Sequence, residues 1–299
     1  MTYKESLTAY LQQRYAPHTA KEYAREINIY LSNYPAAQQA MHKDIAAYAG
    51  LLRQRYSNSR TIVKIVASIK VYYAYLCHEG VRSDNPCNSL RIRGKGRKAI
   101  QLQDLFTSEE LEALLHRPQR FKTLAVRGEV IMGLLVYQGL KPSEIAALTV
   151  TDINLSTGSI YIKASPSSNA RHLQLKGGQA LVMQHYITVV RPQLLAAKPS
   201  GQLKEPASLL TSRSRVSDAL KAKDVIAQVL QIGKKIYPGR GLSAQKIRQS
   251  VIANLLKQGH DISVVQAFAG HRSPDSTKLY SQERVAGLQA AVAACHPLQ

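Results

Sequence analysis

The chain has 299 residues, more than the roughly 100–200 residues of a typical domain, so we expect two domains. Lys and Arg outnumber Asp and Glu by 40 to 19, and 45% of the residues are hydrophobic. A formal net charge of +21 on a chain that can bury a core indicates a folded protein with a polyanionic partner, usually nucleic acid. No apolar run approaches the ~20 residues of a membrane-spanning helix, and the first residues lack a signal-peptide pattern. We therefore expect no membrane partner.

Cysteine usage points to a reducing compartment. The three cysteines, Cys77, Cys87 and Cys295, are widely spaced and form no CxxC pair. An odd, scattered set is not typical of a disulfide framework or a zinc site. We expect a cytoplasmic protein with no metal.

Residues 1–90 are predicted to be almost entirely helical and to form one domain. The expected helix starts are a segment near Tyr3, a capping box at Thr19–Glu22, and caps at Asp44 and Ser59, with the last helix ending before Gly80. Eleven of the sixteen tyrosines lie between Tyr3 and Tyr75. Stacking on bases is one interpretation, but tyrosines at helical spacing usually pack in a core, and we place most of them there.

Basic residues concentrate in this first third. Over residues 1–98, Lys and Arg outnumber Asp and Glu by 16 to 6. The start of the fourth helix is a candidate phosphate-contacting face, with a solvated charged face as the alternative. The segment 91–105 is a predicted basic linker that can lie along a phosphate backbone. The candidate DNA-contacting residues are Arg53, Arg55, Arg60, Lys64, Arg91, Arg93, Lys95, Arg97 and Lys98.

Residues 106–299 are predicted to form a second domain, mostly helical with one small antiparallel sheet. Its helices are expected at about 107–115, 130–137, 141–148, 179–190, 217–233, 245–258, 261–269 and 285–294. Strands are expected at 150–155, 159–164 and 171–175, with a turn at 165–169. The whole chain is thus mainly α with a small antiparallel sheet.

Three segments carry a resemblance to a known family. They are Gly139–Leu148, Gln245–Arg248, and the run from Asp261 through Gly270 and His271 to Tyr280, nine residues after the histidine. Their order and spacing resemble the tyrosine recombinase family of phage integrases and Xer-like proteins, over essentially the whole chain. Each residue alone has a plainer interpretation as packing, capping or surface charge.

The resemblance implies a core-binding helical domain, a basic linker and a catalytic domain with a three-stranded sheet, together forming a C-shaped clamp on double-stranded DNA. It implies that Tyr280 attacks a phosphodiester to give a 3′-phosphotyrosine and a free 5′-hydroxyl, without a metal or other cofactor. Arg248 stands at the second-arginine position and His271 at the position of the family's last histidine. Such groups suit a phosphorane because they donate hydrogen bonds to its extra negative charge.

The match to the family's catalytic set is incomplete. The first-arginine position holds Lys141, which keeps the charge but loses the two-pronged fork. The histidine three residues before Arg248 is Gln245, which cannot shuttle protons near neutral pH. The lysine expected in the β-turn falls near Pro166 and is missing or displaced. Lys163 and Arg171 are the candidate replacements for it as general acid.

Two functions therefore stay open. The first is a site-specific recombinase or integrase, for instance of a mobile element, acting by integration, excision, inversion or chromosome resolution. The second is a weak or inactive relative that binds DNA as an architectural protein. The family resemblance also implies a homotetramer on DNA, with the C-terminal helix (Val285, Leu288, Val292) exchanged between subunits, in the bacterial cytoplasm on the nucleoid.

Overall fold

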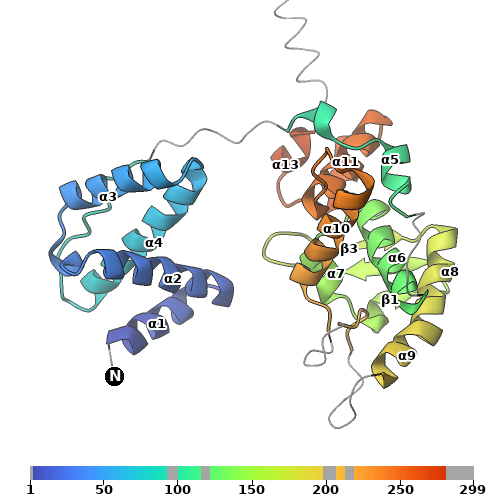
Figure 1. The fold of residues 1–299 in the computed structure, drawn as a ribbon, viewed down its shortest axis with the longest axis horizontal. Coiled ribbons are helices and arrows are strands. Elements are labelled where there is room, and N and C mark those ends of the chain that lie inside the picture. The colour runs from blue at the N-terminus through green and yellow to red at the C-terminus, as the bar shows by residue number, and fades with distance from the viewer. Residues whose placement is uncertain (1–2, 93–99, 116–121, 198–206, 213–218, 281–299) are drawn as a thin grey trace, which may run out of the picture. The chain divides into compact units, whose positions relative to one another are not determined.

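The structure is a computed structural model that describes residues 3–92, 100–115, 122–197, 207–212 and 219–280. The chain divides into two compact units, Met1–Lys98 and Ala99–Gln299 (Figure 1). Among the described residues, no helix is long and apolar enough to cross a membrane.

Unit 1 is a helical bundle. Its helices are α1 (Tyr3–Arg14), α2 (Pro17–Asn33), α3 (His42–Arg55) and α4 (Ser59–His78), with a short 3-10 turn at Ala37–Gln39. The prediction that most of its tyrosines pack in the core is confirmed, because five are buried there and five more pack against it: Tyr30, Tyr48, Tyr72, Tyr73 and Tyr75, and Tyr10, Tyr15, Tyr23, Tyr34 and Tyr56. Tyr30 and Tyr73 are fully buried, their hydroxyls lie 2.7 Å apart, and the Tyr73 hydroxyl donates to the Ala37 carbonyl at 2.7 Å. Burying these rings leaves no unpaired hydroxyl in the core, because each hydroxyl has a hydrogen-bond partner.

Three predicted caps in unit 1 are wrong. Helix α2 starts at Pro17, where the fixed proline φ favours a first turn, so Thr19 lies inside the helix. Asp44 lies in the first turn of α3 and accepts the Met41 N–H at 2.8 Å. Asn58, one residue before Ser59, caps α4 by accepting the Arg60 N–H at 3.0 Å.

Unit 2 packs helices around a small sheet (Figure 1). Its first helices are α5 (Ser108–Glu112), α6 (Lys122–Val136) and α7 (Pro142–Ala147). After the sheet follow α8 (Gly177–His185), a π-helical turn at Tyr186–Val190 and α9 (Arg191–Ala196). The last described helices are α10 (Ala222–Ile236), α11 (Ala244–Lys257), α12 (Ile262–Ala269) and α13 (Asp275–Lys278). The predicted helix at 285–294 and the expected helix start at 217 lie outside the described residues.

The sheet is antiparallel, in the order β1 (Ile153–Asn154), β2 (Ser159–Ile162), β3 (Arg171–Gln174). Ile160 of β2 pairs with both neighbours and is fully buried in the core of unit 2. The predicted first strand is too long, because Asp152 accepts the Thr149 N–H and hydroxyl and holds 150–152 in a 3-10 turn. The prediction of a mainly helical fold with one small antiparallel sheet is confirmed.

Candidate active site

Glu144 is the buried centre of the site. It lies in the first turn of α7, and its Oε2 accepts the Lys141 N–H at 2.8 Å. Arg171, at the start of β3, donates to both carboxylate oxygens at 3.0 Å. The Ser168 hydroxyl adds a third side-chain donor at 2.9 Å. Glu144 thereby fastens the β2–β3 turn to the start of α7.

The carboxylate stays charged despite its burial. Burial raises the pKa of Glu144, but the hydrogen bonds from Arg171 and the Lys141 N–H, with the charges of Arg171 and Arg248, hold it below the ordinary value. The site therefore contains one buried negative charge among several positive groups.

Arg248 reaches into the same region from α11. Its Nη1 donates to the Gly139 carbonyl at 2.6 Å and its Nη2 to the Ala269 carbonyl at 2.5 Å, and Nη1 lies 3.9 Å from Glu144 Oε2. Burial lowers the pKa of Arg248, and the Glu144 charge opposes that shift. These contacts fix the guanidinium between the end of α12 and the loop before α7.

His271 follows α12 and faces α13. Its Nδ1 lies 2.9 Å from the Thr277 hydroxyl. Burial, and then the charges of Arg248, Lys141 and Arg171, lower the pKa of His271 to about 4. The imidazole is therefore neutral at pH 7, with one N–H to donate and one nitrogen to accept.

We expect this histidine to make the protein less stable toward acid. Above pH 6.5, its ordinary pKa, His271 is neutral in both the folded and the unfolded chain, and it adds no pH dependence. Between pH 6.5 and about 4 the unfolded chain binds a proton that the folded chain does not, so stability falls with pH. His271→Asn should flatten this decline in urea unfolding, and His260→Asn, at an exposed position, should not. An equal difference between His271→Asn and wild type at every pH would contradict the assignment.

Gly270 sits where a side chain does not fit. It caps α12 with a φ of 66°, in the left-handed region. A Cβ there would lie 2.6 Å from Arg171 Nη1 and 3.1 Å from the Asn169 carbonyl oxygen. The Asn169 N–H donates to the Gly270 carbonyl at 3.0 Å. The glycine thus lets the β2–β3 turn close onto the segment that carries His271.

Gly270→Ala should therefore lower the free energy of unfolding by more than its backbone strain alone would. Gly259→Ala is a matched control, because Gly259 has a φ of 85° and nothing within 4 Å of a built Cβ. We expect about 1–2 kcal/mol lost in the control and a larger loss at Gly270, measured by urea unfolding. Equal losses would show that the Arg171 approach does not constrain position 270.

Lys141 joins the site through the turn. Its Nζ donates to the Ser167 carbonyl at 3.0 Å and lies 3.2 Å from the Ser167 hydroxyl. The other predicted residues are placed differently. Gln245 is exposed on α11. Lys163 is exposed and ion-paired with Asp152 at 3.1 Å. Arg171, the second candidate acid, is 7% exposed and directs its fork at Glu144.

Tyr280 lies just beyond α13. It is 9% exposed and packs in a small cluster with Ile252, Val265 and Ala269. Tyr280 lies close enough to Arg248 to oppose slightly the lowering of the Arg248 pKa, which burial dominates. Helix α13 ends at Lys278 with Leu279 as its C-cap, so Tyr280 follows the helix rather than lying within it.

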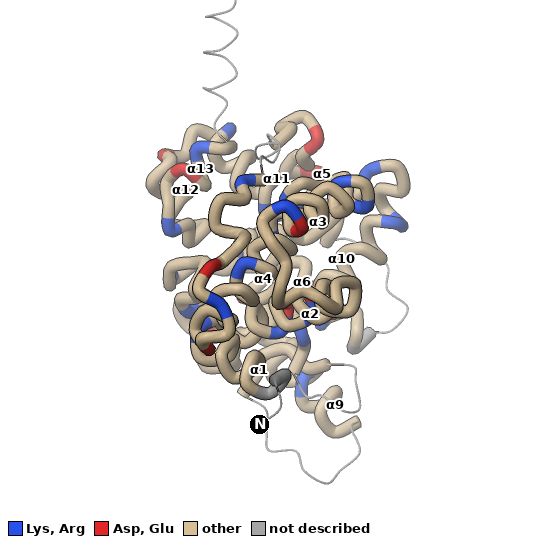
Figure 2. The backbone as a smooth tube through the Cα atoms, turned by 90° about the vertical axis from the view of Figure 1, so that its left-hand side faces the viewer, with Lys and Arg blue, Asp and Glu red and all other residues tan. Residues whose placement is uncertain are grey.

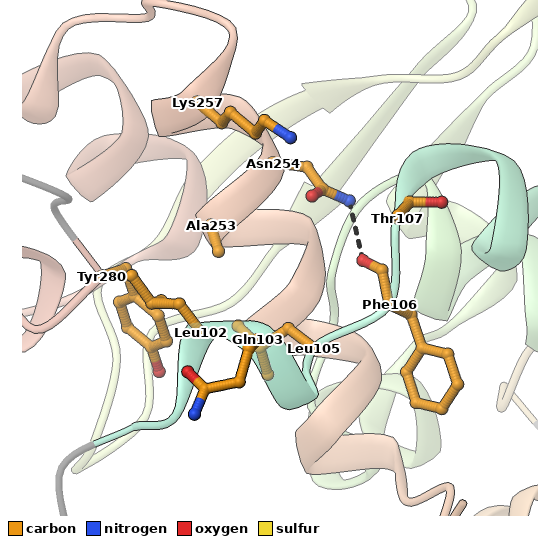
Figure 3. Close-up of a pocket in the computed structure, with 9 residues that line it drawn as sticks. All are labelled: Leu102, Gln103, Leu105, Phe106, Thr107, Ala253, Asn254, Lys257 and Tyr280. Atoms are coloured by element: carbon orange, nitrogen blue, oxygen red, sulfur yellow. Dashed lines mark hydrogen bonds between the residues drawn. The ribbon is translucent and has the colours of Figure 1, made fainter.

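Tyr280 also lines a pocket of about 340 Å³ (Figure 3). Helix α11 forms one wall through Ala253, Asn254 and Lys257, and the segment from Leu102 to Thr107 forms the other. The Asn254 amide ties the walls together by donating to the Phe106 carbonyl at 3.1 Å. The nucleophile candidate therefore lies between a polar cluster and a partly apolar pocket.

Glu144, Ser167 and Ser168 also belong to the site, although they were not predicted from the sequence. Glu144 lies inside the Gly139–Leu148 segment that carried the resemblance, three residues after Lys141. That spacing, a carboxylate one helical turn after a basic residue and a proline, was an available signal for a first-turn acceptor.

The basic candidates of unit 1 lie on its surface. Arg53, Arg55 and Arg60 are exposed around the end of α3 and the start of α4. Lys64 is exposed but ion-paired with Glu22 at 2.6 Å. Along the described backbone of the whole chain, Figure 2 shows Lys and Arg at many positions and Asp and Glu at few. Arg91 is exposed, whereas Arg93, Lys95, Arg97 and Lys98 lie outside the described residues.

Two family models match the chain. The model described as "Phage integrase family" matches residues 104–286, and "Phage integrase, N-terminal SAM-like domain" matches residues 5–80. The first match alone covers more than half of the sequence. The chain belongs to the phage integrase family, and the resemblance inferred from its motifs is confirmed.

Two relatives match nearly the whole chain. The chain is 24% identical to the tyrosine recombinase XerC of Lactobacillus leichmannii over 298 residues, covering 97% of each. It is 23% identical to the tyrosine recombinase XerD of Halalkalibacterium halodurans, covering 94% of this chain and 92% of the relative.

Two solved structures share the fold. The Tn1549 transposon integrase in complex with transposon right end DNA has a TM-score of 0.70 at 15% identity, covering 97% of this chain and 100% of that one. A lambda integrase dimer bound to a core site has a TM-score of 0.68 at 15% identity, covering 95% and 78%.

Proposed function

We propose that this protein is a site-specific DNA recombinase in which Tyr280 forms a 3′-phosphotyrosine with the cleaved strand and releases a 5′-hydroxyl. The observation that supports this most is the grouping of Lys141, Arg248 and His271 around Glu144, with Tyr280 in electrostatic range of Arg248. Positive groups and a neutral imidazole suit a phosphorane, which carries more negative charge than the diester.

The geometry supports a role for each residue in this proposal. Arg248 is held rigidly by two carbonyls, so its remaining N–H groups are preorganised for a phosphate oxygen. Neutral His271 can donate one hydrogen bond to a second oxygen without adding charge. Gln245, exposed on α11, can offer an amide N–H to the same phosphate but not a proton. Energy of the broken bond is kept in the phosphotyrosine, so the proposed reaction needs no metal or nucleotide.

A covalent trap tests the proposal. Genomic fragments bound by the protein are sequenced, and the recovered motif is built into a nicked duplex whose short cleaved strand diffuses away. Wild type should accumulate a denaturant-resistant protein–DNA adduct, and Tyr280→Phe should form none. Tyr161→Phe, at an exposed tyrosine on β2, is the control that should match wild type.

A DNA-binding protein without chemistry is the second candidate. The observation that favours it is that the arginines already use their hydrogen-bond donors within the protein. Both ends of the Arg171 guanidinium bind Glu144, and two Arg248 donors bind backbone carbonyls. Tight binding of the recovered motif with no adduct from wild type would favour this candidate.

We also propose a homotetramer on DNA that exchanges its C-terminal helix, acting in the bacterial cytoplasm. The support is the apolar spacing of Val285, Leu288 and Val292 in the sequence, together with family membership. Removing residues 284–299 should then abolish higher-order assembly on DNA, measured by light scattering, while single-site binding persists. Unchanged assembly would contradict the exchange.

We further propose that the exposed arginines of unit 1 contact DNA phosphates. Arg53→Gln together with Arg60→Gln should weaken binding uniformly across sequences and reduce the slope of log affinity against log salt by about 2. Lys64→Gln is a comparison of interest because its charge is already paired with Glu22, and it should change the slope less. Equal slopes for the double variant and wild type would exclude this face.

A further inference from the structure

The turn between β2 and β3 is fastened on two sides. Its Asn169 N–H donates to the Gly270 carbonyl at 3.0 Å, and Arg272 donates to the Ser165 carbonyl at 2.9 Å. On the other side the Lys141 ammonium donates to the Ser167 carbonyl at 3.0 Å. The turn therefore bridges the residue before α7 and the segment that carries His271.

Lys141 differs from Lys163 and Arg171, the two cations that flank this turn in the sequence, in what it contacts. Lys163 Nζ is paired with the Asp152 carboxylate at 3.1 Å, and Arg171 is paired with Glu144 at 3.0 Å. The Lys141 ammonium instead binds only neutral oxygens of Ser167 and forms no ion pair with a described carboxylate. An ammonium without a carboxylate partner keeps its proton available for an incoming anion.

The Lys141 ammonium is accessible from solvent and has a lowered pKa. Lys141 is half-buried and Ser167 is exposed, so their contact lies at the surface, where a phosphodiester can reach it. Burial, followed by the charges of Arg248 and Arg171, lowers the pKa of Lys141, while Glu144 opposes the shift. A lower pKa makes the ammonium a better proton donor than an ordinary surface lysine.

We propose that Lys141 is the general acid of DNA cleavage, held at the β2–β3 turn by Ser167. This inference rests on the proposed recombinase function. As the bond from Tyr280 Oη to phosphorus forms and the bond from phosphorus to the 5′-oxygen breaks, one Nζ proton passes to that leaving oxygen. The phenolic proton is lost to solvent, and Lys141 recovers its proton from solvent. Ligation runs the same transfers in reverse.

With Lys141 as the acid, the β2–β3 turn needs no lysine of its own. Residues 165–169 carry no ionisable side chain, and the two cations closest in sequence, Lys163 and Arg171, are engaged by carboxylates. The ammonium reaches the turn from the residue before α7 instead. Position 141 then needs a lysine, because an arginine has a pKa above about 12 and is a poor acid.

Sulfur substitution tests the assignment. The nicked duplex recovered above is made with oxygen or with sulfur bridging phosphorus and the 5′-carbon at the cleaved bond. A thiolate leaves without protonation, so loss of the acid should slow cleavage of the oxygen duplex alone. We expect Lys141→Gln and Lys141→Arg to slow that duplex by about 10²–10⁴-fold and the sulfur duplex by less than about tenfold.

Control variants separate the acid from a structural role. Lys234→Gln makes the same charge change at an exposed position on α10 and should leave both rates near wild type. Ser167→Ala removes the hydroxyl contact but leaves the carbonyl contact, so it should slow the oxygen duplex modestly and the sulfur duplex not at all. A change on both duplexes would assign Ser167 a structural role only.

The outcomes are distinct. Equal losses on both duplexes would make Lys141 a charge or folding residue and overturn the acid assignment, as would Lys141→Arg at or above the wild-type rate on the oxygen duplex. If Lys163→Gln shows the oxygen-specific loss instead, the acid is Lys163. If wild type forms no adduct with either duplex, the recombinase function fails and this inference fails with it.

Discussion

Replacing Glu144 with glutamine is expected to lower the free energy of unfolding by about 3–5 kcal/mol, because it leaves buried positive charge without its carboxylate. Arg171 is 7% exposed and Arg248 is 8% exposed, so water cannot easily replace the lost partner. The amide also cannot accept the Arg171 fork on both atoms. Urea unfolding followed by circular dichroism measures the loss.

The matched control is Glu112→Gln. Glu112 pairs with Lys176 at 3.7 Å with both side chains exposed, so we expect less than about 1 kcal/mol. The Glu144 effect should also depend on pH. Its folded pKa lies below the ordinary 4.5, so its contribution is complete above 4.5 and is lost as pH falls through the folded value. A loss at Glu144 no larger than at Glu112 would remove Glu144 from the centre of the site.

Replacing Arg248 with lysine is expected to slow covalent cleavage by about 10²–10³-fold, the typical effect of removing one preorganised donor to a developing anion. A lysine keeps the charge but cannot donate to the Gly139 and Ala269 carbonyls while also facing a phosphate. Single-turnover adduct formation on the nicked duplex measures the rate.

Arg240→Lys is the control for Arg248→Lys. Arg240 is paired with Glu110 at 2.5 Å and lies over the Phe106 ring. We expect its cleavage rate to stay near wild type. A cleavage rate of Arg248→Lys within about threefold of wild type would show that this guanidinium does not bind the reacting phosphate, whatever its structural role.

Much of the fold follows from local patterns. The apolar spacing of Ile62, Ile65 and Ile69 predicts α4, and the β-formers at 160–162 predict β2. Capping was less predictable, because neighbouring side chains compete for the same N–H groups. Asn58 and Ser59 are both good caps, and only the backbone conformation at 58 decides between them.

The site was predictable only in part, for a physical reason. Motif spacing indicated Lys141, Arg248, His271 and Tyr280 because each lies in a short conformationally defined segment. The contacts that join them depend on the β2–β3 turn closing onto α7 and Gly270, a pairing of segments far apart in the chain. Periodicity contains no information about that closure, so Glu144 and Ser167 were not predicted.

The same long-range closure separates the candidate acids. From sequence, Lys163 and Arg171 flank the turn and look equally available. In the fold, the 3-10 turn at Val150–Asp152 presents Asp152 to Lys163, and α7 presents Glu144 to Arg171. Lys141, assigned from sequence to phosphate binding alone, is the lysine that contacts the turn without a carboxylate partner among the described residues.

The proposed function requires Tyr280 to be the residue that bonds to DNA. The most direct measurement is mass spectrometry of the trapped adduct after digestion with trypsin and nuclease. If Tyr280 is the nucleophile, there should be one modified peptide, with a nucleotide joined through its 3′-phosphate to Tyr280, and a free 5′-hydroxyl on the released strand. A nucleotide on any other residue, or a 5′-phosphate linkage, would contradict it.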